Sequence, residues 1–215
     1  MQGICYIFGA GEVTLKQFAP KADDYVIAAD GGFDHLKKLG VHPDMLLGDF
    51  DSLEAVPEHE NIVRHPVEKD DTDTMLAAKT ALQMGYRVFV VYGGTGGRLD
   101  HTLANIQLLS FLAARGAQGY LTDGDQVITV LQNKTVLFDA HSKGILSVFA
   151  HGGDACGVTE TGLKYPLSGA VLRCDDPLGV SNAFLGVESS VGVAQGQIVV
   201  LWHEKNFHAE KMKFL

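Results

Sequence analysis

Short apolar runs and segments with helical period alternate along the first half of the chain. The apolar runs resemble strands buried on both faces of a parallel sheet, and they cover residues 4–8, 25–29, 45–47 and 88–92. Apolar positions three or four residues apart predict helices over residues 33–39, 72–82 and 99–112. Gly40 is a natural end for the first helix, and Thr72 or Asp71 can cap the second. This alternation predicts a parallel sheet flanked by helices.

The second half of the chain has a different pattern, because short apolar segments there are separated by turn residues. The turn signals fall at residues 123–125, 133–134, 142–144, 152–153 and 196–197. Such spacing predicts an antiparallel β domain, arranged as a sandwich. The predicted fold class is therefore α/β, with a Rossmann-like parallel-sheet domain over residues 1–122 and a β-sandwich domain over residues 123–215. Residues 118–122 would form the last strand of the first domain.

Composition and charge narrow the class of function. The chain has 215 residues, and its formal net charge of −9 argues against a nucleic-acid binder, whose affinity comes mainly from cations on phosphates. No apolar run reaches the roughly 18 residues that a membrane helix needs, so we expect no membrane association. Cys5, Cys156 and Cys174 form no Cys-x-x-Cys pair, which fits a reducing cytoplasm.

Two carboxylates, Asp49 and Asp51, follow the apolar run 45–47. If that run is a strand, the two side chains point the same way, because side chains alternate across a strand. Carboxylates at this spacing can share Mg²⁺, which takes oxygen ligands from one or two carboxylates and from substrate phosphates. Taken alone, the pair could equally be a helix cap beside a solvated acid. Its place at the end of a strand predicts magnesium and phosphate chemistry.

Three further motifs lie beside predicted strand ends or helix starts, and each has a structural explanation of its own. Asp30-Gly31-Gly32 ends the second strand and could be a tight turn in which glycine adopts positive φ. The acids of residues 70–73 precede a helix, whose dipole favours negative charge there. The loop from Gly93 to Arg98 can offer backbone N–H groups to phosphate oxygens, although it lacks the ending of a P-loop.

Together, the motifs bring five acids to one sheet edge, where they would repel one another without cations. These acids are Asp30, Asp49, Asp51, Asp73 and Asp100. The set resembles the thiamine pyrophosphokinase family, whose motifs occur in the same order. The matching segments are Ala-Asp-Gly-Gly at 29–32, Gly-Asp-Phe-Asp-Ser at 48–52, Lys-Asp-Asp-Thr-Asp at 69–73, Gly-Gly-Thr-Gly-Gly-Arg-Leu-Asp-His at 93–101 and, more weakly, Gly-Val-Ser-Asn at 179–182.

The resemblance implies transfer of diphosphate from ATP to the hydroxyethyl group of thiamine, with Mg²⁺, giving thiamine diphosphate and AMP. It also implies a homodimer with thiamine between the α/β domain of one subunit and the sandwich of the other. The implied catalytic residues are Asp49, Asp51, Asp73 and Asp100; Asp49, Asp51 and Asp73 would hold the metal and triphosphate, and Asp73 or Asp51 is the candidate base. The implied ATP- and thiamine-binding residues are Asp30, Gly31, Gly32, Asp70, Thr72, Gly94, Thr95, Gly96, Gly97, Arg98, Ser181 and Asn182.

Three other functions are compatible with parts of the pattern. A pyrophosphokinase acting on a pterin alcohol would use the same metal chemistry, and a nucleotide-sugar glycosyltransferase also carries an Asp-x-Asp pair. A non-catalytic sensor of nucleotide or thiamine would have no need for the whole set of acids. Two single residues stay ambiguous as well. His101 could touch the nucleotide or cap its helix, and Trp202 is more often core or interface packing than a platform for a cationic ring.

Overall fold

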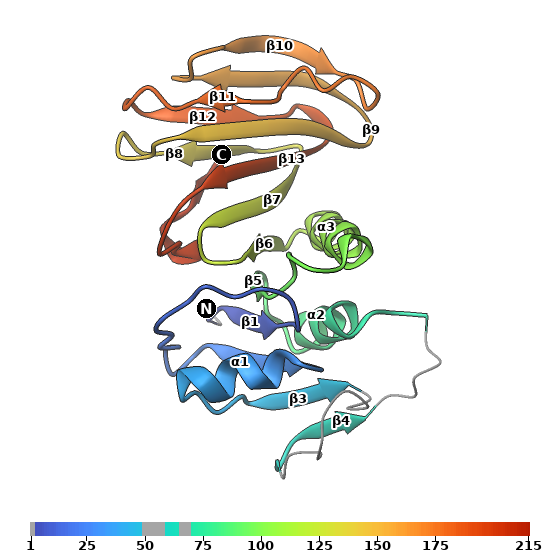
Figure 1. Cartoon of the computed structure of the whole chain (residues 1–215). Helices are drawn as coiled ribbons and strands as arrows, with labels where there is room; N and C mark the ends of the chain where they lie inside the picture. Colours follow the sequence, from blue (N-terminus) through green and yellow to red (C-terminus); the bar gives the residue numbers. More distant parts are fainter. Residues whose placement is uncertain (1–2, 49–58, 65–69) are drawn as a thin grey trace. The chain divides into compact units, whose positions relative to one another are not determined.

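A computed structural model describes residues 3–48, 59–64 and 70–215 and divides the chain into two compact units (Figure 1). The first unit covers Met1–Gly124 and the second Asp125–Leu215. Asp49 and Asp51 lie outside the described residues, so their predicted roles rest on the sequence alone.

The first unit is built on a parallel sheet. Its strands are β1 (Cys5–Phe8), β2 (Tyr25–Ala29), β3 (Met45–Gly48), β4 (Ile62–Arg64), β5 (Val88–Tyr92) and β6 (Gln118–Thr122). They lie in the order β6-β5-β1-β2-β3-β4, and every pairing between neighbours is parallel. The chain therefore builds outward from β1 in one direction and then from β5 in the other. The strand order reverses between β1 and β5, which is where open α/β sheets bind ligands.

Three helices of the described part pack on this sheet, and they are α1 (Gly32–Leu39), α2 (Asp73–Gln83) and α3 (Leu99–Ala113). The predicted signals account for their ends. Gly40 ends α1 in the left-handed conformation, with φ 68°. The Thr72 side chain caps α2 by accepting a hydrogen bond from the Met75 N–H. Helices α1 and α2 both pack on β1 and β2, whereas α3 packs on β6 and α2.

Only part of the apolar pattern of α3 faces the core. Leu109 and Leu112 are buried as the helical period predicts, but Leu99 and Leu103 are 71% and 57% exposed. The helix therefore presents its first apolar turns to solvent within this unit. Periodicity identifies the helix correctly but does not show which part of its apolar stripe the sheet covers.

The second unit consists of antiparallel pairs, as its turn spacing predicts. Its strands are β7 (Gln126–Gln132), β8 (Thr135–Phe138), β9 (Ile145–Thr161), β10 (Leu167–Leu172), β11 (Asn182–Ala183), β12 (Ser189–Gly192), β13 (Gln195–His203) and β14 (Lys213–Phe214). The long strand β9 organises the unit, because its first part pairs with β13 and β11 and its second part with β10 and β12. The register against β13 shifts between His151 and Cys156, a stretch that includes Gly152 with φ 71°.

The core of the second unit settles the ambiguity of its single tryptophan. Trp202 is 2% exposed and packs edge-on against Phe138, with 5.4 Å between ring centroids. Its indole N–H donates to the Glu204 carboxylate at 2.7 Å. The ring is therefore core packing with a satisfied polar group, as the sequence favoured.

Candidate functional site

A cavity of about 380 Å³ lies in the first unit at the carboxyl ends of the parallel strands. The residues that line it come from five places: the loop after β1, the end of β2 with the residue after it, the start of α2, the loop between β5 and α3, and α3 itself. They are Gly9, Ala10, Gly11, Ala29, Asp30, Thr72, Asp73, Thr74, Gly93, Gly94, Gly96, Gly97, Arg98, His101 and Asn105. The cavity thus occupies the point where the strand order reverses, as expected for a ligand site in this architecture.

Backbone hydrogen bonds join the two loops that flank this point. The Gly11 N–H donates to the Gly93 carbonyl at 2.7 Å, and the Glu12 N–H donates to the Thr95 carbonyl at 3.0 Å. Gly93 has φ 64°, and a Cβ there would lie 2.3 Å from the Gly9 carbonyl oxygen. Only glycine allows this conformation and this close approach at position 93. The two loops therefore form one fixed rim.

Two of the predicted acids meet at the cavity. Asp73 is the first residue of α2, and Asp30 follows β2 in a left-handed conformation with φ 49°. The motif could have been a tight turn with glycine at positive φ, but Gly31 has φ −60° and the positive φ belongs to Asp30. A non-glycine residue in this region is sparsely populated and is often held there at functional sites. The residue held in this backbone conformation is therefore the one that carries the carboxylate.

Arg98 and Asp100 form a pair at the start of α3. The guanidinium donates two hydrogen bonds, from Nε to Oδ1 at 3.2 Å and from the terminal nitrogen to Oδ2 at 2.6 Å. These hydrogen bonds lower the pKa of the Asp100 carboxyl from its usual range. Both side chains are largely exposed. Arg98 lines the cavity and Asp100 does not. A phosphate group in the cavity would therefore compete with Asp100 for the hydrogen bonds of the Arg98 guanidinium.

Several predicted residues of the first unit do not line the cavity. Among its described residues, these are Gly31, Gly32, Asp70, Thr95 and Asp100. Thr95 is still notable, because its hydroxyl oxygen is buried and has no hydrogen-bond partner in the described part of the chain. Their assignment to substrate binding stays a prediction.

The predicted Ser181 and Asn182 lie in the second unit. Ser181 is exposed and has φ 63°, and its N–H donates to the Ser147 hydroxyl at 3.1 Å. The Asn182 amide is 4% exposed and is fully used within the unit. Its oxygen accepts from the Tyr165 and Ala183 N–H groups, and its nitrogen donates to the Tyr165 carbonyl and to Glu160. Asn182 therefore holds this segment in place, and its contribution to thiamine binding stays a prediction.

Glu160 is the buried acidic residue of this network, and its raised pKa leads us to expect a stability that depends on pH. The side chain is 1% exposed; burial raises the pKa of its carboxyl, and the hydrogen bond from Asn182 only partly opposes that rise. Glu160 ionises more readily in the unfolded chain than in the folded one. Its contribution to the free energy of unfolding is therefore fully present below the usual glutamate pKa and is lost as pH rises through the raised pKa of the folded state.

We therefore expect Glu160→Gln to become more stable relative to the wild type as pH rises above about 4.3. The difference in free energy of unfolding should grow by at most about 1.4 kcal/mol per pH unit. Urea denaturation of both proteins over a series of pH values above the usual pKa of a glutamate, about 4.3, measures this difference. Parallel stability profiles over that range would contradict the expected titration of Glu160.

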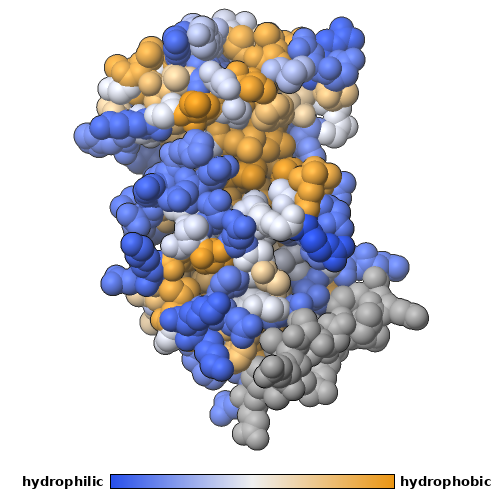
Figure 2. Space-filling view, viewed as in Figure 1, coloured by the Kyte–Doolittle hydropathy of each residue, from blue (hydrophilic) through white to orange (hydrophobic). Residues whose placement is uncertain are grey.

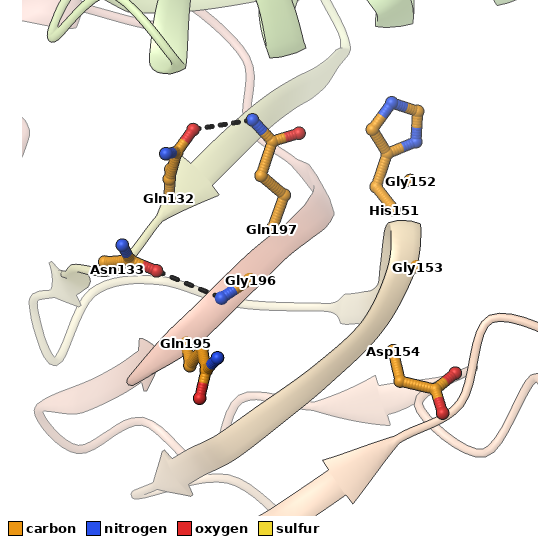
Figure 3. A pocket seen from close by; sticks show the side chains of 9 residues that line it. All are labelled: Gln132, Asn133, His151, Gly152, Gly153, Asp154, Gln195, Gly196 and Gln197. Carbon is orange, nitrogen blue, oxygen red and sulfur yellow. Dashed lines mark hydrogen bonds between the residues drawn. The ribbon is translucent and has the colours of Figure 1, made fainter.

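A second hollow, of about 330 Å³, lies in the second unit where β9 is irregular (Figure 3). Figure 3 shows two hydrogen bonds closing its floor, from the Gln197 amide to Gln132 at 2.7 Å and from the Gly196 N–H to Asn133 at 3.0 Å. His151 and Asp154 project from β9 without meeting each other. None of the predicted site residues lines this hollow. This hollow lies beside the register shift of β9, and we do not assign the predicted site to it.

Sequence reasoning missed three parts of the candidate site. No role was predicted for the Gly9–Gly11 loop, although glycines directly after the first strand of such a sheet can mark the switch point. Thr74 and Asn105 also line the cavity. Asn105 could have been found as a polar residue within the apolar stripe of α3, but nothing local shows what it contacts.

The fold and the cavity define an α/β protein with a glycine-rich rim and two carboxylates at the carboxyl edge of a parallel sheet, an arrangement typical of sites for phosphorylated ligands. Comparison with known families makes the class specific. Residues 16–121 match the catalytic domain of thiamin pyrophosphokinase, and residues 134–198 match the vitamin B1 binding domain of the same family. The two matches together span most of the chain and fall one in each compact unit. The chain belongs to the thiamin pyrophosphokinase family and is an enzyme of that family.

Individual relatives agree with this assignment. The chain is 29% identical over 211 residues to the thiamine pyrophosphokinase of Bacillus subtilis, covering 94% of this chain and 98% of the relative. Among solved structures, the thiamine pyrophosphokinase of Bacillus subtilis superposes with a TM-score of 0.81 at 24% identity, covering 95% of this chain and all of that one. The thiamin pyrophosphokinase of Geobacillus thermodenitrificans superposes with a TM-score of 0.78 at 27% identity, covering 95% and 99%.

Proposed function

We propose that this enzyme transfers the diphosphate group of ATP directly to the hydroxyethyl group of thiamine, forming thiamine diphosphate and AMP. The observation that carries the proposal is the cavity at the switch point, where a glycine rim faces the carboxylates of Asp30 and Asp73. The match of the second unit to a vitamin B1 binding domain supports thiamine as the acceptor. Pterin alcohols and nucleotide sugars have no comparable support.

Mg²⁺ fits the donor set of the cavity. Hard cations of this size take carboxylate and phosphate oxygens, and the cavity offers Asp73 and Asp30 beside the Thr72 hydroxyl. We assign the metal to Asp73 together with Asp49 and Asp51, and Asp30 belongs to the same acidic group. When bound, the metal neutralises phosphate charge and orients the triphosphate. A bound cation would also offset the repulsion between ATP and a chain with net charge −9.

The chemistry requires positioning more than covalent help. The thiamine hydroxyl oxygen forms a bond to the β phosphorus, and the bond from that phosphorus to the oxygen shared with the α phosphate breaks, so AMP leaves. The hydroxyl proton passes to a carboxylate, for which Asp73 and Asp51 are the candidates. Backbone N–H groups of the Gly94–Gly97 loop bind phosphate oxygens, and the unpartnered Thr95 hydroxyl lies in the same loop.

We further propose a homodimer whose site combines both units. Exposed apolar side chains occur at both parts of the predicted site, and Figure 2 shows apolar surface gathered over the second unit. In the first unit these are Leu99 and Leu103, and around Ser181 they are Leu178, Val180, Leu185 and Val187. Contiguous exposed apolar patches are unusual on monomers and mark interaction surfaces. A second copy would cover them and bring Ser181 of one subunit to the cavity of the other.

The finer points of fold and location belong to the same proposal. We assign the first domain, residues 1–122, to a Rossmann-like fold and the second, residues 123–215, to a β-sandwich. The three cysteines are unpaired, which agrees with a reducing cytoplasm. None of the helices in the described part of the chain has the length and apolar character needed to cross a membrane.

Product analysis tests the proposal. The purified enzyme is incubated with ATP and Mg²⁺, with thiamine, with a pterin alcohol or with neither, and nucleotides and thiamine esters are separated chromatographically. We expect AMP and thiamine diphosphate in equal amounts, formed only when thiamine is present. ADP with thiamine monophosphate would indicate an ordinary kinase, turnover with the pterin alcohol would reassign the acceptor, and nucleotide binding without turnover would indicate a sensor.

A further inference from the structure

Asn105 is a buried polar side chain in the middle of the apolar stripe of α3. It is 4% exposed, and its neighbours on the helix, Leu108 and Leu109, are almost completely buried. A polar amide in such surroundings is costly unless its hydrogen-bonding groups are satisfied. Asn105 also lines the cavity, so its hydrogen-bond partners indicate its role there.

A chain of hydrogen bonds runs through Asn105 between two walls of the cavity. Its amide nitrogen donates to the Gly94 carbonyl at 2.9 Å, and its amide oxygen accepts from the Thr74 hydroxyl at 2.7 Å. The single hydroxyl proton of Thr74 is donated to Asn105. In the 3.2 Å contact between the Thr72 and Thr74 hydroxyl oxygens, Thr72 is therefore the donor. Thr72 in turn accepts from the Met75 N–H as the cap of α2. The chain thus links the cap of α2 to the glycine loop.

The packing around Gly94 makes the position of the loop depend on this side chain. A Cβ at Gly94 would lie 3.0 Å from the Asn105 amide nitrogen and 2.4 Å from a Leu121 methyl carbon. The loop therefore rests directly on Asn105 and cannot move closer. Losing the amide donor would leave the Gly94 carbonyl without this hydrogen bond, which favours movement of the loop away from α3.

We propose that Asn105 is a positioning residue that fixes the distance between the start of α2, which carries Asp73, and the glycine loop after β5. The inference rests on the proposed function, in which Asp73 holds the metal and the loop holds the phosphates. Asn105 contacts both walls through one rigid amide, and α3 supports it from behind. Because transfer to the β phosphorus depends on the relative placement of these walls, a small displacement has a large effect on rate.

Two variants remove one end of the chain each while changing shape little. Asn105→Asp keeps an acceptor for Thr74 and loses the donor to Gly94, and we expect kcat/KM for ATP to fall by about 10²-fold. Thr74→Val removes the other hydrogen bond and should cost about tenfold. Thr74→Ser retains the hydroxyl and should restore activity close to the wild-type value. The double variant should lose less than the product of the two single losses, because both break one chain.

Leu112→Ala is the matched control for a merely structural role. Leu112 is fully buried on the same helix and does not line the cavity, so its truncation should lower Tm without changing kcat or KM where the protein is folded. All variants are assayed at a temperature at which circular dichroism shows them folded. If Asn105→Asp and Thr74→Val lower Tm but keep kcat/KM within about threefold of the wild type, in the manner of the control, the positioning role is overturned.

Calorimetric binding of ATP with Mg²⁺ separates this inference from the proposed function. Absence of thiamine-dependent turnover in the wild type would overturn the proposed function alone, and weaker nucleotide binding by Asn105→Asp than by Leu112→Ala would still support the positioning role. Equal binding by wild type and Asn105→Asp, together with unchanged turnover, would overturn it. A wild-type protein that neither binds nor consumes ATP would overturn both.

Discussion

Replacing Asp73 with asparagine is expected to lower kcat for thiamine-dependent AMP formation by about 10²- to 10³-fold. Asp73 is the described carboxylate at the start of α2, lines the cavity and is a predicted metal ligand. Asparagine keeps the shape of the side chain but loses the charge that holds a hard cation. The loss of a favourable dipole interaction at the helix start should cost only about 0.3–1 kcal/mol of stability. Steady-state kinetics over a range of Mg²⁺ concentrations measures the effect.

Asp71→Asn provides the matched control, because it removes the same charge two residues earlier. Asp71 accepts a hydrogen bond from the Lys79 ammonium at 2.6 Å and does not line the cavity. A partly exposed pair of this kind contributes little to stability, so we expect kcat within about twofold of the wild type. Equal losses in both variants would mean that the general acidity of this segment matters, and no loss in Asp73→Asn would remove Asp73 from the proposed metal site.

Gly32→Ala is expected to destabilise the first unit by about 3 kcal/mol or more. A Cβ on Gly32 would lie 1.8 Å from the Phe8 carbonyl oxygen and 3.1 Å from the Gly9 nitrogen. Both are backbone atoms of the central strand and its loop, so neither can move without displacing the cavity wall at Gly9. The variant should therefore lose stability and activity together. Urea denaturation followed by circular dichroism measures the stability.

Gly31→Ala is the matched control, because it replaces the neighbouring glycine at a position where a Cβ meets no backbone atom so closely. Gly31 already has φ −60°, and an added Cβ would meet chiefly the Ala10 Cβ at 3.0 Å. We expect its free energy of unfolding to stay within about 1 kcal/mol of the wild-type value. If Gly32→Ala were as stable as Gly31→Ala, close packing of α1 on β1 would not be the reason for glycine at position 32.

The elements of the first unit were predictable because their signals are local. Strand β2 follows from its apolar run, the start of α2 from the cap at Thr72, and the end of α1 from Gly40. Each of these signals acts over only a few neighbouring residues. The short strand β4 (Ile62–Arg64) was not predicted, since three residues give too little pattern. In the second unit, Gly152 and Gly153 read as a turn, whereas the chain continues through them as one long strand.

The site was predictable only where its residues have a chemical signature. Asp30, Asp73 and the glycine loop stand out as acids and glycines at element ends, and the structure brings them to one cavity. Asn105 and Thr74 carry no such signature, because their importance arises from contacts between elements far apart in the sequence. Likewise, a helical period identifies α3 but does not show that its own sheet leaves Leu99 exposed.

The most direct test of diphosphate transfer follows the β phosphorus of ATP. The enzyme is incubated with thiamine, Mg²⁺ and ATP labelled at that phosphorus, and the labelled products are separated. Transfer of the intact diphosphate predicts that the label appears in thiamine diphosphate, at the same rate as unlabelled AMP. Label recovered in ADP or in inorganic phosphate, with thiamine carrying a single phosphate or none, would contradict the central claim.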